Sequence, residues 1–259
     1  MRALLHKELG TGPHLAYIPG IDGTGELLLD TANRLAKHWH VLCLRYVGKG
    51  EDSYEALANS VLQVLEQAGV QDAVLVAESF GGGLALQVAL TDPSRVRALM
   101  IVNSFCYCLR RLRLALTRLS APLAQGPLFR LGRRYFGSAA LIGKDATDEE
   151  RRLFHSKSGT ALDAAYRRRL GMIPRLDLRA RLAEIQQPVQ LIAAGRDRVV
   201  DSYASAELML AGLPNAELRR LPESGHLVLP LSAHPWVDWL EELEGRASTL
   251  ASGGQPAQS

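Results

Sequence analysis

The chain has 259 residues and a formal net charge of +3. This length is sufficient for one domain with a complete hydrophobic core. No continuous apolar run is long enough to cross a bilayer, which argues against a membrane-spanning protein. The N-terminal segment MRALLHKELGTG is too short and too charged for a secretory signal, so we expect a cytoplasmic protein.

The cysteines Cys43, Cys106 and Cys108 are odd in number, and Cys43 lies in an apolar segment. We therefore expect buried or partly buried free thiols in a reducing compartment. Cys106 and Cys108 have no further cysteine or histidine at the spacing of a metal site, so no metal is predicted. No motif indicates an organic cofactor.

Strand-like and helix-like patterns alternate along most of the chain, which predicts an α/β fold with a mainly parallel sheet and helices on both faces. The first residues are expected to add an antiparallel edge strand. Strands are expected near residues 13–19, 39–46, 72–78, 97–103, 188–194 and 216–221, and helices near 24–37, 52–68, 80–91, 202–212 and 233–245.

Residues 14–25, HLAYIPGIDGTG, are predicted to lead from a strand into a glycine-dense loop before a helix. Glycines allow such a loop to bring its backbone close to a bound carbonyl group. Phosphate-binding and dinucleotide-binding loops occupy the same kind of junction. However, the order of these glycines does not fit G-x-G-x-x-G, and the Gly-Lys-Ser/Thr ending of a P-loop is missing.

Residues 74–84, VLVAESFGGGL, combine an apolar β-branched segment with Ser79 and three glycines. We interpret them as a strand-to-helix turn that exposes the Ser79 hydroxyl at a helix N-terminus, where the dipole favours developing negative charge. A serine among glycines is also a common helix cap. Ala77 stands where the motif G-x-S-x-G has its first glycine, and its small side chain suits this place.

An acid and a histidine follow in the order of a serine hydrolase triad. Asp197 comes after the apolar segment of PVQLIAAGRDRVVD (188–201), and His226 lies in LPESGHLV (221–228). Taken singly, Asp197 could be a turn former and His226 a surface histidine. Asp201 is a rival acid, although it is better suited to cap the helix that follows. Together the residues predict Ser79 as nucleophile, His226 as base and Asp197 as its orienting acid.

The segment 104–186 interrupts the alternation, with helical patterns and no convincing strand. Residues 105–186 carry 17 Lys/Arg and 7 Asp/Glu, so this segment is strongly basic. Within it, residues 109–119 (LRRLRLALTRL) place leucines on one helix face and arginines largely on the others. The favoured interpretation is a solvated basic face with leucines packed over an apolar pocket. The alternative is a lid that contacts an anionic membrane surface or guides anionic substrates.

On these motifs the chain resembles the α/β-hydrolase family over residues 13–245. Pro19–Gly25 and Glu78–Gly82 are similar to the esterase/lipase/thioesterase group that includes plant phytyl ester synthases. The resemblance implies an α/β-hydrolase core over 1–103 and 187–246, with a helical cap over 104–186. Residues 247–259 are small and polar and are expected to be a disordered tail.

The resemblance also implies an oxyanion hole formed by the backbone N–H groups of Phe80 and Ile21. Gly20 and Asp22 in the same loop are the expected substrate-binding residues. In the commoner motif of the family this loop opens with His-Gly, whereas here it opens with Pro19-Gly20. No histidine side chain is therefore expected to act there.

We accordingly expect a carboxylic ester hydrolase that acts on small-molecule esters with apolar groups through an acyl-enzyme. A thioesterase or an acyltransferase would use the same residues, and a hydrolase-fold ligand-binding protein can retain them without catalysis. Aromatic residues are too sparse among the arginines to predict a nucleic-acid partner. The sequence leaves the oligomeric state open.

Overall fold

The computed structural model describes residues 1–48, 50–109, 141–157 and 164–253. Its centre is a seven-stranded sheet in the order β1-β3-β2-β4-β5-β6-β7. β1 pairs antiparallel with β3, and the other neighbours are parallel, which confirms the predicted sheet and edge strand. The strands are β1 (Arg2–Leu9), β2 (His14–Ile18), β3 (His40–Val47), β4 (Ala73–Glu78), β5 (Val96–Val102), β6 (Val189–Ala194) and β7 (Ala216–Leu221).

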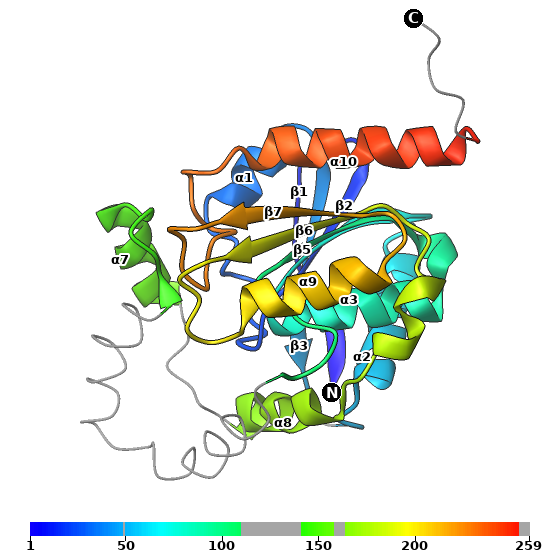
Figure 1. The fold of residues 1–259 in the computed structure, drawn as a ribbon, viewed down its shortest axis with the longest axis horizontal. Helices are drawn as coiled ribbons and strands as arrows, with labels where there is room; N and C mark the ends of the chain where they lie inside the picture. Colours follow the sequence, from blue (N-terminus) through cyan, green and yellow to red (C-terminus); the bar gives the residue numbers. More distant parts are fainter. Residues whose placement is uncertain (49, 110–140, 158–163, 254–259) are drawn as a thin grey trace, which may run out of the picture.

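Helices cover both faces of the sheet (Figure 1). Successive strand residues point to opposite faces, so Leu15 and Tyr17 pack with one layer while Ala16 and Ile18 pack with the other. The first layer contains α1 (Thr31–Leu35) and α10 (Trp236–Ala251), and the second contains α2 (Tyr54–Gln67), α3 (Phe80–Thr91) and α9 (Ser202–Gly212). Because the central strands are buried on both faces, their sequences are apolar throughout rather than alternating.

Two predicted helices differ in length from the observed ones. The helix expected over 24–37 is regular only over α1, because Leu29 adopts a φ of +48° that interrupts it just before Asp30. The tail expected over 247–259 is wrong for residues 247–251, which continue α10 with Ala247 buried against the sheet layer. Residues 254–259 lie outside the described residues.

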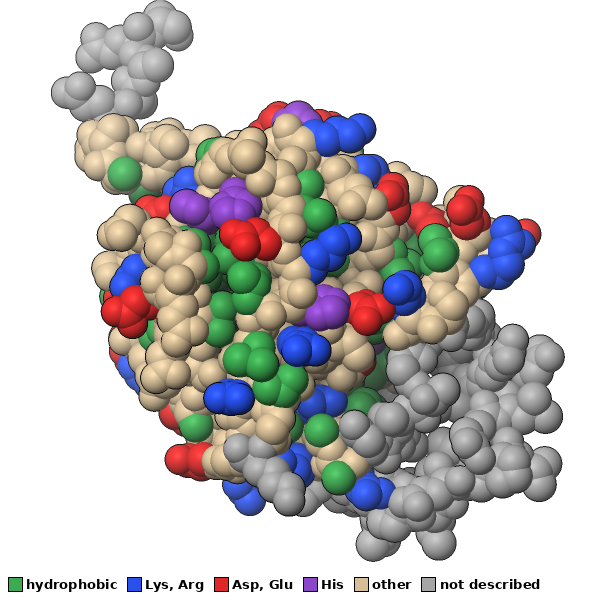
Figure 2. Space-filling model, turned by 180° about the vertical axis from the view of Figure 1, so that it is seen from behind, with side chains coloured by type: hydrophobic (Ala, Val, Ile, Leu, Met, Phe, Trp, Pro, Cys, Tyr) green, Lys and Arg blue, Asp and Glu red, His purple; other side chains and the backbone are tan. Residues whose placement is uncertain are grey.

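Helices make up much of the described part of the segment 104–186, whereas residues 104–109 and 142–147 are not helical. The helical parts are α7 (Asp148–Lys157), α8 (Ala164–Met172) and the 3₁₀ turns η4 (Ile173–Arg175) and η5 (Arg179–Glu184). Of the predicted basic helix over 109–119, all but Leu109 lies outside the described residues. On the face shown in Figure 2, basic and acidic side chains of the described residues are interspersed. No helix in the described ranges combines the length and apolarity of a membrane span.

The first turn of α3 lies directly against the end of β2. A Cβ atom on Gly81 would stand 2.4 Å from the carbonyl oxygen of Ile18 and 2.6 Å from that of Pro19. Both obstacles are backbone atoms, which a rotamer change cannot remove. The glycine is therefore required for the helix to approach the sheet and the loop that follows β2.

We predict that Gly81→Ala lowers the free energy of unfolding by about 1–3 kcal/mol, because either α3 or the loop after β2 must move. Urea denaturation followed by circular dichroism measures this loss. Gly245→Ala is the matched control, since Gly245 lies inside α10 with nothing within 4 Å of its added Cβ. The control should be stabilised by about 0.5–1 kcal/mol, and equal effects of the two substitutions would contradict the steric argument.

Candidate active site

Ser79 lies at the turn between β4 and α3 in a backbone conformation that non-glycine residues rarely adopt. Its φ is +56° and its ψ is −122°. Neighbouring groups hold this turn: the Ser79 N–H donates to the Val102 carbonyl at 2.9 Å, and the Ser104 hydroxyl donates to the Ser79 carbonyl at 2.6 Å. Strain of this kind persists only where the surroundings fix it, and it is concentrated at functional sites.

The turn brings Ser79 to two side chains from distant parts of the chain. His226 Nε2 lies 2.9 Å from Ser79 Oγ, although the two residues are 147 positions apart. On the other side of the ring, His226 Nδ1 lies 2.7 Å from Asp197 Oδ2. The structure thus joins the three residues predicted from the motifs into one hydrogen-bonded chain, with His226 in the middle.

Asp197 is fixed in place by further donors. Its Oδ1 accepts from the Val199 N–H at 2.7 Å, and its Oδ2 accepts from the Ser202 hydroxyl. Asp201, the rival acid, is the N-cap residue of α9, and its backbone carbonyl accepts from the Ser205 N–H at 2.8 Å. The carboxylate that reaches His226 is therefore that of Asp197.

Burial and charge oppose each other in this pair. Burial disfavours the charged form of Asp197, but the adjacent His226 and the hydrogen bonds from Ser202 and Val199 together outweigh it and lower the pKa of the carboxyl group. Burial likewise disfavours the imidazolium of His226, but Asp197 and Glu78 together outweigh it and raise the pKa of the imidazole. The pairing makes His226 a stronger base than an isolated buried histidine would be.

A second buried carboxyl group lies beside the pair. Glu78 is only 2% exposed, and its Oε1 accepts from the N–H groups of Val228 at 3.0 Å and Leu229 at 3.3 Å. Burial raises the pKa of Glu78 to about 7. When ionised, Glu78 adds to the raised pKa of His226. Glu78 therefore holds the backbone that follows His226 and, when ionised, makes His226 more basic.

Asn103 holds the same loop from the end of β5. Its Nδ2 donates to the carbonyls of Gly225 at 3.1 Å and His226 at 2.7 Å, and its Oδ1 accepts from the Ala194 N–H at 2.7 Å. One buried amide therefore joins the loop that carries His226 to the end of β6, after which Asp197 follows. Asn103 itself has a φ of +46°.

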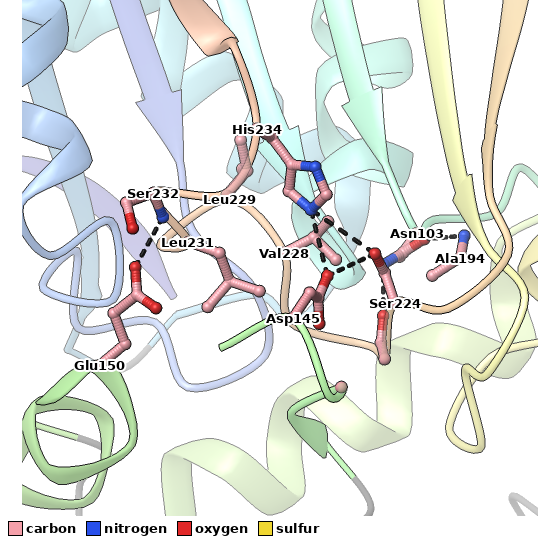
Figure 3. A network of polar contacts seen from close by, with 12 residues as sticks. Asn103, Asp145, Glu150, Ala194, Ser224, Val228, Leu229, Leu231, Ser232 and His234 are labelled. Atoms are coloured by element: carbon pink, nitrogen blue, oxygen red, sulfur yellow. Dashed lines mark hydrogen bonds and ion pairs between the residues drawn. The ribbon is translucent and has the colours of Figure 1, made fainter. Parts of the chain in front are cut away.

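The segment that leads into α7 forms a further set of contacts with this loop (Figure 3). Asp145 accepts from the hydroxyl of Ser224, and its Oδ2 lies 3.2 Å from His234 Nε2. Glu150 Oε1, on α7, accepts from the Ser232 N–H at 2.6 Å. The loop is thus bonded to the segment between β5 and β6 on both sides of His226, at Ser224 before it and at Ser232 and His234 after it.

The glycine loop after β2 lies against the nucleophile. A Cβ on Gly20 would stand in ordinary van der Waals contact with Ser79 Cβ, at 3.7 Å, so Gly20 lies directly beside the serine. Among the described residues, the N–H groups of Ile21 and Phe80 donate no hydrogen bond within the protein. Both remain free for a ligand, as an oxyanion hole requires.

Asp22 has a structural partner in its own loop. Its Oδ2 accepts from the Thr24 N–H at 2.9 Å and from the Thr24 hydroxyl at 2.5 Å. This turn stabilises the loop conformation locally. The expected roles of Gly20 and Asp22 in substrate binding stay predictions.

Among the described residues, no group of three or more His, Cys, Asp or Glu side chains is placed to hold a metal ion.

The chain resembles known proteins in sequence and in overall fold. A family profile described as alpha/beta hydrolase fold matches residues 13–233. The chain belongs to this family. It is 28% identical over 240 residues to a Serratia proteamaculans protein named as a carbamate hydrolase, RutD, and the match covers 86% of this chain and 87% of that one.

Solved structures of the family share the fold. A hydrolase from Pseudomonas aeruginosa PA01 superposes with a TM-score of 0.74 at 22% identity, covering 95% of this chain and 93% of that one. The esterase RhEst1 from Rhodococcus superposes with a TM-score of 0.75 at 16% identity, covering 96% and 98%. At these identities the likeness describes the architecture of the α/β hydrolase.

We predict that Asp197→Asn lowers kcat by about a thousandfold or more, because the amide would favour the wrong tautomer of His226. Asp201→Asn should leave kcat nearly unchanged, since its side chain is not the partner of the histidine. Steady-state kinetics on a chromogenic ester compares the two variants. The assignment of the acid is wrong if the Asp201 variant is the more damaged one.

We also predict a pH effect of Glu78→Gln. Catalysis by this geometry requires neutral His226, so activity rises as pH passes upward through the pKa of the histidine. The Glu78 carboxylate raises that pKa, and its removal should therefore shift the acidic limb of the kcat/KM profile to lower pH. Glutamine keeps an acceptor for the N–H groups of Val228 and Leu229. An unshifted limb would show that Glu78 does not act on the titration of His226.

Proposed function

We propose that the protein is a serine hydrolase that cleaves carboxylic esters through an acyl-enzyme. The observation that carries the proposal is the continuous hydrogen-bonded chain from Ser79 through His226 to Asp197. A serine hydroxyl is a weak nucleophile until a neighbouring base accepts its proton, and that base lies 2.9 Å away. The raised pKa of His226 is consistent with this task.

In the first half of the reaction, Ser79 Oγ attacks the ester carbonyl carbon while His226 Nε2 takes the hydroxyl proton. Asp197 stabilises the imidazolium that results and keeps its Nδ1 proton in place. The tetrahedral intermediate then collapses: the bond between carbon and the alcohol oxygen breaks, and His226 gives its proton to the departing alcohol. Ser79 is left acylated.

In the second half, His226 accepts a proton from water, whose oxygen attacks the acyl carbon. Collapse of the second intermediate breaks the bond to Ser79 Oγ, and the proton returns from His226 to the serine. In both halves the negative oxygen is proposed to accept from the N–H groups of Ile21 and Phe80. Phe80 is also the first residue of α3, where the helix dipole favours this charge.

Carbamates are a second candidate substrate class. The relative from Serratia proteamaculans named as a carbamate hydrolase covers most of this chain. A carbamate presents a carbonyl flanked by nitrogen, which the same serine can attack with the same base and oxyanion donors. The carbamate nitrogen donates its lone pair into the carbonyl, which makes that carbonyl less electrophilic than an ester carbonyl. Because the Ser–His–Asp chain can act on both classes, the fit of the leaving group decides between them.

We predict that Ser79→Ala lowers turnover of a short p-nitrophenyl ester by about a thousandfold or more, because it removes the nucleophile. The substitution removes a single hydroxyl and leaves no large cavity, so the thermal midpoint should change little. Labelling by a fluorophosphonate probe should be stoichiometric in the wild type and absent in the variant. Activity within about tenfold of the wild type would exclude Ser79 as the nucleophile.

A substrate panel separates the alternatives. Turnover is compared on p-nitrophenyl esters, a matched p-nitrophenyl carbamate and acyl-CoA, with and without a long-chain alcohol. The ester proposal predicts the highest kcat/KM on the esters. Faster cleavage of the carbamate or the thioester, or transfer to the alcohol, would reassign the reaction, and labelling of Ser79 without multiple turnover would indicate a ligand-binding protein.

A further inference from the structure

Two neighbouring arginines on α8 reach from the segment between β5 and β6 to different loops of the core. Arg168 binds Asp52 with Nε and Nη2, both at 2.7 Å, and donates to the Gly48 and Gly50 carbonyls. Arg169 is only 3% exposed. Its Nε donates to the Ile21 carbonyl at 2.6 Å and its Nη2 to the Asp22 carbonyl at 2.9 Å. Only Arg169 therefore contacts the glycine loop beside Ser79.

The carbonyls that Arg169 binds belong to a tight turn. The Gly23 N–H donates to the Gly20 carbonyl at 3.1 Å, which makes Ile21 and Asp22 the central residues of a β-turn. The peptide between these two residues is the one whose orientation differs between the common turn types. A guanidinium bound to the Ile21 carbonyl fixes that orientation, because rotating the peptide would remove its oxygen from the donor.

Fixing the carbonyls also fixes the N–H groups. In a trans peptide the C=O and N–H bonds point in opposite directions. The Ile21 N–H therefore points away from the Gly20 carbonyl, and the Asp22 N–H points away from the Ile21 carbonyl that Arg169 binds. The Asp22 carbonyl that Arg169 binds shares its peptide with the Gly23 N–H, which donates to the Gly20 carbonyl. Rotation of that peptide would release the Gly20 carbonyl and with it the direction of the Ile21 N–H, the donor proposed to stabilise the oxyanion.

A tyrosine links Arg169 to the other proposed donor. The Arg169 guanidinium lies 5.9 Å from the centre of the Tyr46 ring, and the Tyr46 hydroxyl donates to the Pro19 carbonyl at 2.7 Å. The same ring packs edge-on against Phe80 at 5.9 Å. Space around the turn is filled, since a Cβ on Gly23 would meet Tyr46 at 2.7 Å and Arg169 at 3.0 Å.

We propose that Arg169 is a positioning residue for the oxyanion hole: it holds the turn Gly20–Gly23 so that the Ile21 N–H faces the substrate carbonyl. A buried guanidinium is costly to desolvate, and its charge-assisted hydrogen bonds to two successive carbonyls offset that cost. On this proposal α8 sets the geometry of a catalytic donor. This inference rests on the proposed serine hydrolase function.

The test compares Arg169→Gln with Arg168→Gln, its neighbour on the same helix. A misplaced oxyanion donor should lower kcat of Arg169→Gln by about tenfold to a hundredfold. KM should stay within about threefold, because the interaction is made mainly in the transition state. The inhibition constant of a boronic acid, which forms a tetrahedral adduct with Ser79, should weaken in parallel with kcat/KM. Arg168→Gln should change kcat by less than about threefold, since it does not touch this turn.

Hydrogen exchange of the Gly23 amide, which donates the hydrogen bond of the turn, gives a readout that does not require turnover. Exchange at this amide should be faster in Arg169→Gln and unchanged in Arg168→Gln. If Arg169→Gln fails to fold, Arg169→Lys is used, because an ammonium keeps the charge but lacks the planar fork that spans two carbonyls. Its kcat should lie between those of the wild type and the glutamine variant.

Several outcomes would overturn the proposal. Equal losses of kcat in the two glutamine variants would mean that α8 serves only to dock its segment on the core. A rise in KM with unchanged kcat would make Arg169 a ground-state binding residue. If the wild type hydrolyses none of the substrates, the proposed function fails, and unchanged amide exchange in Arg169→Gln would then separately refute the positioning role.

Discussion

The site depends on the parallel pairing of β4, β5 and β6, which continues for one residue beyond the ends of β4 and β5. The Ser79 N–H donates to the Val102 carbonyl, and the Asn103 N–H donates to the Ile192 carbonyl. Because parallel strands share a direction, their carboxyl ends meet at one edge of the sheet. The nucleophile, the amide that orients the histidine loop and the strand before the acid are thereby brought together by the sheet itself.

Polar burial at this edge is tolerated because nearly every buried group has a partner. Glu78 accepts two backbone hydrogen bonds, Asn103 joins two loops, and Asp197 accepts from three kinds of donor. A buried group without partners would cost several kcal/mol. The hydrogen bonds of the network offset that cost. They also fix the positions of the loops, since each side chain can satisfy its hydrogen bonds in only one arrangement of the loops.

Much of the fold and the Ser79–Asp197–His226 set could be predicted from the sequence, because apolar strands and small-residue turns leave local signals. Glu78 and Asn103 carry weaker signals: each ends a predicted strand, so their convergence at one sheet edge could have been inferred. Arg169 could not be found in this way. It lies in a run of three arginines, and burial of only one of them follows from tertiary packing that periodicity does not report. The break at Leu29 in the helix predicted over 24–37 likewise leaves no signal in the periodicity.

The segment that precedes α7 and the histidine loop approach each other through backbone at two glycines. A Cβ on Gly143 would stand 2.5 Å from the Gly225 nitrogen, and the Leu227 N–H donates to the Leu141 carbonyl at 2.9 Å. For protein engineering, this contact defines where the region between β5 and β6 can be exchanged. Residues 141–150 are joined to the loop that carries His226 by these contacts, so a chimera that exchanges this region should retain them and join the foreign segment outside this stretch.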